Sequence, residues 1–269
     1  MLEWRRRREP SMAMLWLSPL IAIGLTMLAG MLVFTAMGYD GFHAVGSIFV
    51  TPFVESQRWA DIGVKAAPLV MIALGLAIGF RANVWNIGAE GQYVMGAVAG
   101  TGVALLTYDM TGWWILPAMA LAGILGGMAW AAIPALLRVK LQVSEILTSL
   151  MLTYVAVQLL YYLVRGPWKD PGGFNFPQTR MFTADQTLPA VMEGSLVHIG
   201  IPAALVIAVV AWLLMEKTTA GYAVKVVGLA PAAARHGGFS AARTTWATML
   251  LGGGLAGLAG LFEAAGPFG

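Results

Sequence analysis

The few charged residues divide the chain into long uncharged stretches. Five of these contain between 19 and 30 residues, and they lie between positions 9 and 40, 109 and 138, 145 and 165, 193 and 216, and 243 and 263. A helix that crosses a lipid bilayer needs about 20 apolar residues, with roughly 17 to 25 tolerated. Each stretch therefore predicts a membrane span.

Two shorter spans are predicted on either side of Arg81 and Glu90. Fifteen uncharged residues follow Lys65 and 18 follow Glu90, so we expect spans at residues 64–80 and at about residues 84–106. With the five longer stretches they make seven spans. The predicted fold class is an all-α, polytopic integral membrane protein with about seven transmembrane helices.

Composition agrees with a chain whose main solvent is lipid. Apolar residues make up 59% of it and charged residues 11%, against roughly 25% charged residues in ordinary soluble proteins; the mean hydropathy is +0.76. A soluble protein of this length could not cover its surface with so few charges. This excludes a soluble enzyme, a nucleic-acid-binding domain and a disordered scaffold. The chain has no cysteine, which excludes disulfides and thiolate metal sites.

The basic residues predict the orientation. Arg5 to Arg8 precede the first apolar stretch, residues 12–37, which is far longer than the roughly 7–15 apolar residues of a secretory signal. We therefore expect an uncleaved first helix and a cytoplasmic N-terminus. With seven spans, this arrangement puts 11 of the 16 Lys and Arg residues on the cytoplasmic side, in agreement with the positive-inside rule.

Sequence motifs for ATP hydrolysis, metal binding and dinucleotide binding are lacking. No glycine precedes a lysine, so the phosphate-binding GxxxxGK[ST] loop is absent, and the three histidines are scattered; we expect no metal and no cofactor. Gly252, Gly254 and Gly257 match GxGxxG, but they lie inside a predicted span and follow no strand. Small residues at Gly253 and Gly257 instead predict close helix packing.

The first of three polar stretches is GFRANVWNIGAEGQ, residues 79–92, which places Asn83, Asn86, Glu90 and Gln92 among helix-weakening glycines. Two interpretations stay open. One is a solute pathway, because an ionisable residue within a membrane commonly marks function. The other is a polar cytoplasmic turn with Glu90 in the first turn of the next helix, where the helix dipole favours a carboxylate.

The second polar stretch is SEILTSLMLTYVA, residues 144–156. Ser144 is expected to cap a helix, and Glu145 suits the positive end of that helix. For Thr148, Ser149, Thr153 and Tyr154 we favour hydrogen bonds to neighbouring helices over direct contact with a ligand.

The third polar stretch, residues 218–238, lies within a predicted cytoplasmic loop at residues 216–244. Pro231 suits the first turn of a helix, the following alanines favour helix, and Gly237 ends it. This predicts a short surface helix, ending with Arg235 and placed between two turns. Such a helix is suited to docking into a groove of a partner, and the alternative is a plain connecting loop.

Together the three stretches resemble the permease subunits of bacterial ATP-binding-cassette (ABC) importers, in the branch for simple sugars, nucleosides and branched-chain amino acids. GFRANVWNIGAEGQYVMGA and SEILTSLMLTYVA look most like nucleoside and simple-sugar permeases, and GYAVKVVGLAPAAARHGG is similar to the cytoplasmic segment that contains the coupling helix. The similarity runs from about Val64 to the end of the chain.

The resemblance implies a non-enzymatic pore subunit for a small polar solute in the bacterial inner membrane. Its expected partners are cytoplasmic ATPase subunits, a second permease subunit (identical or different), an extracytoplasmic solute-binding protein and the lipid bilayer, with no nucleic acid. By position, the ATPase-coupling residues would be Gly228, Ala230, Pro231, Ala232, Ala234 and Arg235. The residues beside the translocation path would be Asn83, Trp85, Asn86, Glu90 and Gln92.

The sequence departs from the family pattern in two places. Leu229 and Ala230 replace the polar pair usual before the alanine run, and such permeases usually continue through further spans after GLAGLFEAAGP. We therefore expect residues 1–269 to be a single permease domain that is incomplete at its C-terminus. The alternative function is an ion-coupled secondary transporter that uses Glu90 or Glu263, although such folds contain inverted repeats that the seven predicted spans lack. A membrane-embedded enzyme is the third class, and the sequence offers it no nucleophile–base pair.

The predicted orientation has a direct test. A reporter fused after Lys217 is expected to be accessible only from the cytoplasm. An even number of predicted spans lies between that residue and the N-terminus, which is expected to be cytoplasmic. Accessibility measured in intact and permeabilised cells distinguishes the two sides. A reporter that is reached only from outside would contradict the seven-span arrangement.

Overall fold

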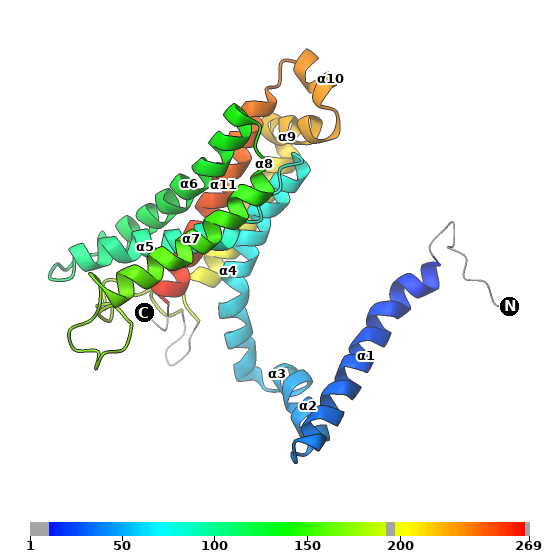
Figure 1. The fold of residues 1–269 in the computed structure, drawn as a ribbon, viewed down its shortest axis with the longest axis vertical. Coiled ribbons are helices and arrows are strands. Elements are labelled where there is room, and N and C mark those ends of the chain that lie inside the picture. Colours follow the sequence, from blue (N-terminus) through cyan, green and yellow to red (C-terminus); the bar gives the residue numbers. More distant parts are fainter. Residues whose placement is uncertain (1–10, 192–196, 267–269) are drawn as a thin grey trace. The chain divides into compact units, whose positions relative to one another are not determined.

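The structure is a computed structural model that describes residues 11–191 and 197–266. Within these ranges the regular elements are helices, apart from one isolated antiparallel bridge between Ala190 and His198. The helices are α1 Met12–Ala36, α2 Gly41–Phe49, α3 Thr51–Val54, α4 Ser56–Arg81, α5 Ala89–Leu106, α6 Ile115–Leu141, α7 Glu145–Arg165, α8 Gly200–Lys217, α9 Thr219–Leu229, α10 Pro231–His236 and α11 Ala241–Ala264 (Figure 1). The predicted all-α class is confirmed.

Six of the described helices are long and apolar enough to cross a membrane: α1, α4 from Arg58, α6, α7, α8 and α11. The polytopic class is therefore confirmed, while the count of seven stays a prediction. The remaining expected span corresponds to α5, which has 18 residues and is not among the six. It begins at Ala89 rather than near position 84, because residues 82–88 form a turn.

The chain divides into two compact units, residues 1–59 and 60–269. In the first, α2 turns back onto α1 after Gly38, whose φ of +87° suits glycine. The Asp40 carboxylate begins α2 by accepting a hydrogen bond from the backbone N–H of His43 at 3.0 Å. The sequence predicted α1 but neither α2 nor α3.

The second unit is organised around α11, which packs most extensively against α5 and α6. In its most apolar 18-residue stretch, 67% of the residues are buried. A Cβ placed on Gly257 would lie 2.2 Å from the carbonyl oxygen of Gly123 in α6, and one on Gly96 of α5 would lie 2.2 Å from the Cα of Gly257. The backbones therefore touch directly, as small residues allow in membrane helices. The helix-packing interpretation of Gly253 and Gly257 is confirmed.

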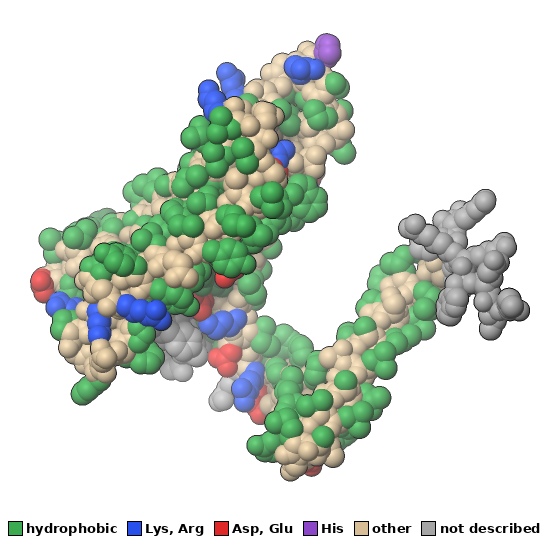
Figure 2. Space-filling view, in the orientation of Figure 1, with side chains coloured by type: hydrophobic (Ala, Val, Ile, Leu, Met, Phe, Trp, Pro, Cys, Tyr) green, Lys and Arg blue, Asp and Glu red, His purple; other side chains and the backbone are tan. Residues whose placement is uncertain are grey.

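Charges are distributed unequally between the two ends of this unit (Figures 1 and 2). The basic end comprises α9, α10, the C-terminal ends of α4, α6 and α8, and the first turns of α5, α7 and α11. Its charged residues are Arg81, Arg138, Lys140, Lys217, Lys225, Arg235 and Arg243, with Glu90, Glu145 and Glu216. The opposite end holds residues of both signs, among them Asp109, Asp170 and Asp185 with Arg165, Lys169 and Arg180. This agrees with the charge bias in the sequence, and a cytoplasmic location of the basic end stays a prediction.

A long irregular segment after α7 covers the opposite end. The buried Gln186 side chain donates to the carbonyl oxygen of Ala104 at 2.8 Å, and the Leu188 N–H donates to the carbonyl oxygen of Ala265 at 2.7 Å. His198 is buried, and its Nδ1 accepts a hydrogen bond from the N–H of Gly200. Burial lowers the pKa of His198, because it disfavours the charged imidazolium. These bonds hold the segment against the ends of α5 and α11.

The surroundings of Gly257 in α11 and of Gly24 in α1 predict opposite effects on stability when each glycine is replaced by alanine. Gly257→Ala forces a Cβ to within 2.2 Å of a backbone oxygen, and overpacking of this kind costs about 1–3 kcal/mol. Gly24→Ala in α1 meets no atom within 4 Å and gains helix propensity of up to ~1 kcal/mol. Thermal unfolding in detergent should show a lower midpoint for the first variant only. Equal midpoints would contradict the packing.

Candidate functional site

The α4–α5 turn, residues 82–88, lies at the basic end. Asn83 ends α4 in the left-handed conformation, with φ of 56°, which asparagine tolerates better than most residues. The N–H of Val84 bonds to the carbonyl oxygen of Gly79, and the N–H of Asn83 bonds to that of Phe80, in the pattern of a Schellman motif. Ala82, Val84 and Asn86 are buried while the residues between them are exposed. Protein therefore covers one side of the break.

Two buried amides fasten this turn to α5. The side-chain nitrogen of Asn86 donates to Oε1 of Gln92 at 2.8 Å, and the side-chain nitrogen of Gln92 donates to Oδ1 of Asn86 at 3.0 Å. Their exposed fractions are 4% and 1%. Buried amides without partners are costly, so this reciprocal pairing stabilises the turn and satisfies the polar groups of both side chains.

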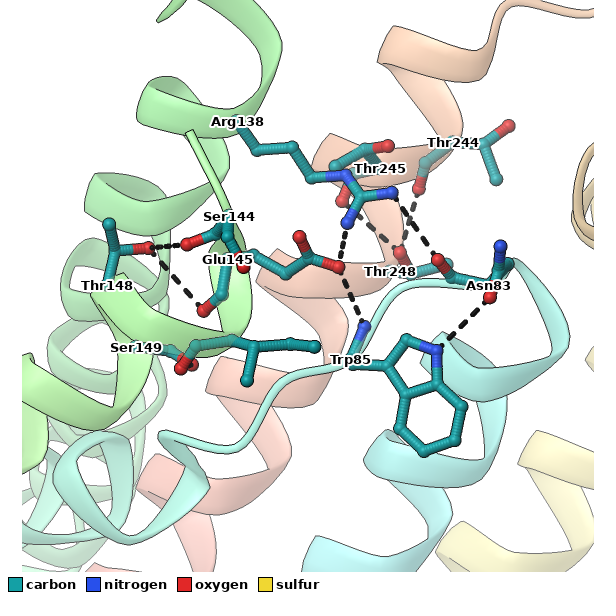
Figure 3. Close-up of polar contacts among 11 residues, drawn as sticks. Asn83, Trp85, Arg138, Ser144, Glu145, Thr148, Ser149, Thr244, Thr245 and Thr248 are labelled. Carbon is teal, nitrogen blue, oxygen red and sulfur yellow. Dashed lines mark hydrogen bonds and ion pairs between the residues drawn. The ribbon is translucent and has the colours of Figure 1, made fainter. Parts of the chain in front are cut away.

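A buried carboxylate joins the turn to α6 and α7 (Figure 3). Glu145, at the start of α7, is 4% exposed. Its Oε1 pairs with the guanidinium of Arg138 at the end of α6 and accepts the backbone N–H of Trp85 at 3.1 Å. Arg138 also donates to the carbonyl oxygen of Asn83 at 3.4 Å. Charge-assisted bonds of this kind are among the stronger ones in proteins, so Glu145 holds three elements together.

Two expectations for the start of α7 are wrong. Ser144 occupies the N-cap position, but its side chain makes no capping hydrogen bond. The hydroxyls of Thr148, Ser149 and Thr153 donate to carbonyl oxygens of their own helix, to Ser144 and Glu145, to Ile146 and to Ser149 respectively, and not to neighbouring helices. Such back-bonding is an alternative that serine and threonine always have within a helix.

Close backbone packing makes the contact between α7 and the start of α5. A Cβ on Gly88 would lie 2.4 Å from the carbonyl oxygen of Ser149, and one on Gly91 would lie 2.8 Å from the Cα of Thr153. The two helices therefore approach at backbone distance near the turn. The sequence singled out both stretches but did not predict that they meet.

The five predicted path residues come together at this turn and divide into two groups. Asn86 and Gln92 are buried and satisfy one another. Asn83, Trp85 and Glu90 are exposed, with Glu90 in the first turn of α5. The indole N–H of Trp85 donates to Oδ1 of Asn83 at 3.1 Å, and its ring lies 4.7 Å from that of Phe80, centroid to centroid.

The predicted coupling segment folds into two helices. The short helix α10, Pro231–His236, is present where the sequence predicted it. The preceding residues form a second helix, α9, where a turn was expected. Phe239 follows α10 and packs edge-on against Tyr222 of α9, with ring centroids 5.8 Å apart. An open groove of about 640 Å³ lies beside α10, lined by Pro231, Ala232, Arg235, Gly238, Phe239, Ser240 and Ala241.

The six predicted coupling residues do not share one surface. Ala230, Pro231, Ala232 and Arg235 are exposed, whereas Ala234 is 1% exposed and faces the unit. Gly228 lies against α4, since a Cβ there would be 2.0 Å from the carbonyl oxygen of Arg81. Within the described residues, no group of three or more His, Asp and Glu side chains is placed to hold a metal ion.

Residues 58–268 match the family described as "Branched-chain amino acid transport system / permease component". The chain belongs to this family. The permease is 37% identical to the glucose ABC transporter permease protein TsgB13 of Haloferax volcanii, in an alignment that covers 97% of this chain and 70% of that protein. No solved structure matches it significantly.

Two further relatives are named for nucleosides. The permease is 29% identical to the guanosine ABC transporter permease protein NupP of Bacillus subtilis, over 94% of this chain and 72% of that one. It is 28% identical to the nucleoside ABC transporter permease protein NupB of Lactococcus lactis subsp. cremoris, over 91% and 69%. It is thus a multi-pass plasma-membrane protein and a transport subunit, not an enzyme. Importers of this family work with separate ATPase and solute-binding subunits.

The Glu145 network predicts a loss of stability when its carboxylate is neutralised. Removing one member of a buried ion pair costs about 3–5 kcal/mol, and we expect roughly 2 kcal/mol for Glu145→Gln because the Arg138 side chain is one-third exposed. The adjacent, exposed Ser144→Ala is the matched control. Thermal unfolding in detergent should separate the two variants. If Glu145→Gln unfolds together with wild type and Ser144→Ala, the pair does not hold the turn.

Proposed function

We propose that the permease moves a nucleoside or a simple sugar inward, driven by ATPase subunits that bind α10. Supporting this, α10 is a separate short helix at the basic end, with an exposed face and an adjoining groove. The named relatives transport glucose, guanosine and nucleosides. Both solute classes are small, polar and without net charge, so the same hydrogen-bonding surface suits either.

The exposed face of α10 would dock in a groove of the ATPase. Pro231 and Ala232 present little side-chain bulk, which favours close approach of a partner backbone, and Arg235 adds one positive charge. Ala234 packs inward and would fix the helix to this chain. Ala230 joins α9 to α10, and Gly228 lies further back against Arg81. We therefore divide the coupling residues into a contact group and a supporting group.

The exposed path residues offer suitable chemistry for a polar solute. Trp85 presents an aromatic face, against which a nucleobase or sugar ring stacks. Asn83 and Glu90 supply hydrogen-bonding groups beside it. Asn86 and Gln92 would act indirectly, by fixing the turn that carries these side chains.

The assembly we propose contains two permease subunits, two ATPases at the basic end and a solute-binding protein at the opposite end. The basic end would face the cytoplasm, as its excess of Lys and Arg indicates. Residues 1–269 would act as one permease domain, with residues 216–244 as the cytoplasmic coupling segment. Alternating access would follow from closure of the ATPases on α10.

Docking through α10 is tested by adding negative charge to its exposed face. Arg235→Glu combined with Ala233→Glu should abolish co-purification of the ATPase and lower solute uptake at least tenfold, because the helix surface becomes acidic without loss of Ala234. Arg180→Glu, at the opposite end, is the control for co-purification. Retained ATPase binding and uptake in the double variant would remove α10 from the interface.

A further inference from the structure

Glu216 bridges two basic residues from different helices at the C-terminal end of α8. Its Oε1 accepts a hydrogen bond from Arg81, the last residue of α4, at 2.9 Å. Its Oε2 accepts one from Lys225, in the middle of α9, at 2.6 Å. One carboxylate thus links three helices, using a different oxygen for each partner. Neither this residue nor Lys225 was among the residues singled out from the sequence.

Close backbone packing accompanies the bridge. A Cβ added to Gly228 of α9 would lie 2.0 Å from the carbonyl oxygen of Arg81. Near the other end of α9, a Cβ on Gly221 would lie 2.4 Å from the carbonyl oxygens of Leu214 and Met215 in α8. Between these contacts, the buried Val224 belongs to the same apolar cluster as residues of α4 and of the α4–α5 turn. Hence α9 has no room to slide without moving its neighbours.

The bridge stands between the coupling helix and the turn. Only Ala230 separates α9 from α10, and backbone bonds run across it, from Ala230 N–H to the Val226 oxygen and from Ala234 N–H to the Ala230 oxygen. On the other side, Arg81 is two residues from Asn83, whose carbonyl oxygen Arg138 binds. A displacement of α10 therefore reaches the turn through a continuous set of packed and hydrogen-bonded groups.

We infer that Glu216, with Arg81 and Lys225, positions α9 so that movement of α10 is transmitted to the α4–α5 turn. This inference rests on the proposed function, since it assigns the route by which ATPase binding acts on the path. The three residues are positioning residues and need not touch the solute or the ATPase. A contiguous network alone does not demonstrate coupling, so variants must separate coupling from folding and from docking.

The experiment reconstitutes the full permease with its ATPase and solute-binding protein in proteoliposomes. Glu216→Gln keeps the size of the side chain but removes its charge. We expect ATPase co-purification and ATP hydrolysis within twofold of wild type, and solute uptake reduced at least fivefold. Lys217→Gln is the matched control, because the neighbouring Lys217 contacts the ring of Trp212 rather than the bridge; it should transport like wild type.

Lys225 supplies a rescue and a test of shared action. Lys225→Arg should retain uptake because it keeps a donor for Glu216, whereas Lys225→Gln should lose it. If the residues act as one unit, Glu216→Gln with Lys225→Gln should be no worse than either single variant. Additive losses in the double variant would contradict the shared role.

Two results would overturn this inference and leave the proposed function intact. One is uptake by Glu216→Gln equal to that of wild type and Lys217→Gln. The other is a proportional fall of uptake, hydrolysis and thermal stability, which would indicate a purely structural bridge. Failure of the wild-type permease to bind the ATPase, or to transport when ATP is supplied, would instead refute the proposed function.

Discussion

Direct backbone contact between α11 and its neighbours α5 and α6 is the constraint on which the second unit depends. In lipid, apolar side chains gain little by leaving one apolar surface for another, so close packing and hydrogen bonds must hold helices together. Glycines at matching positions provide that packing here, as at Gly257 and Gly96. Because α10 precedes α11 by only a few residues, the placement of α11 also fixes where α10 emerges.

At the basic end, hydrogen bonds and ion pairs between polar side chains connect the ends of neighbouring helices. The carboxylates of Glu145 and Glu216 each connect a backbone or side-chain group of the α4–turn region to other helices. Glu145 is buried, and a buried carboxylate is expensive unless its oxygens are paired and hydrogen-bonded; Glu216 is exposed. For both carboxylates, each cationic partner comes from another helix. The α4–α5 turn is therefore a joint between α4, α6 and α7, and through Arg81 it also adjoins α8 and α9.

The sequence predicted where the helices lie better than it predicted how they contact one another. Residues 145–165 were bounded correctly by their flanking charges, and Pro231 marked the start of α10. By contrast, α9 was expected as a turn, because its glycines obscured the helical pattern. The pairing of Arg138 with Glu145 depends on how α6 and α7 are rotated about a break at Gln142, which residue spacing does not specify.

The candidate site was likewise predictable in location but not in role. Asn86 and Gln92 carry polar groups like those of Asn83, yet the fold turns them inward to satisfy one another. Gly228 and Ala234 lie in the predicted coupling segment, but packing directs both toward this chain. Which side chain faces outward is a tertiary property, and this decides which residues can meet a solute or a partner.

The central claim is that α10 is the cytoplasmic docking element for the ATPase. Because the chain lacks cysteine, a single cysteine can be placed at the exposed end of α10 by His236→Cys and joined to cysteines on the ATPase surface by a bifunctional maleimide. The claim predicts a crosslinked adduct from His236→Cys, protection of that cysteine from impermeant reagents outside the cell, and no adduct from Arg180→Cys. Labelling of His236→Cys from outside, without any adduct, would contradict it.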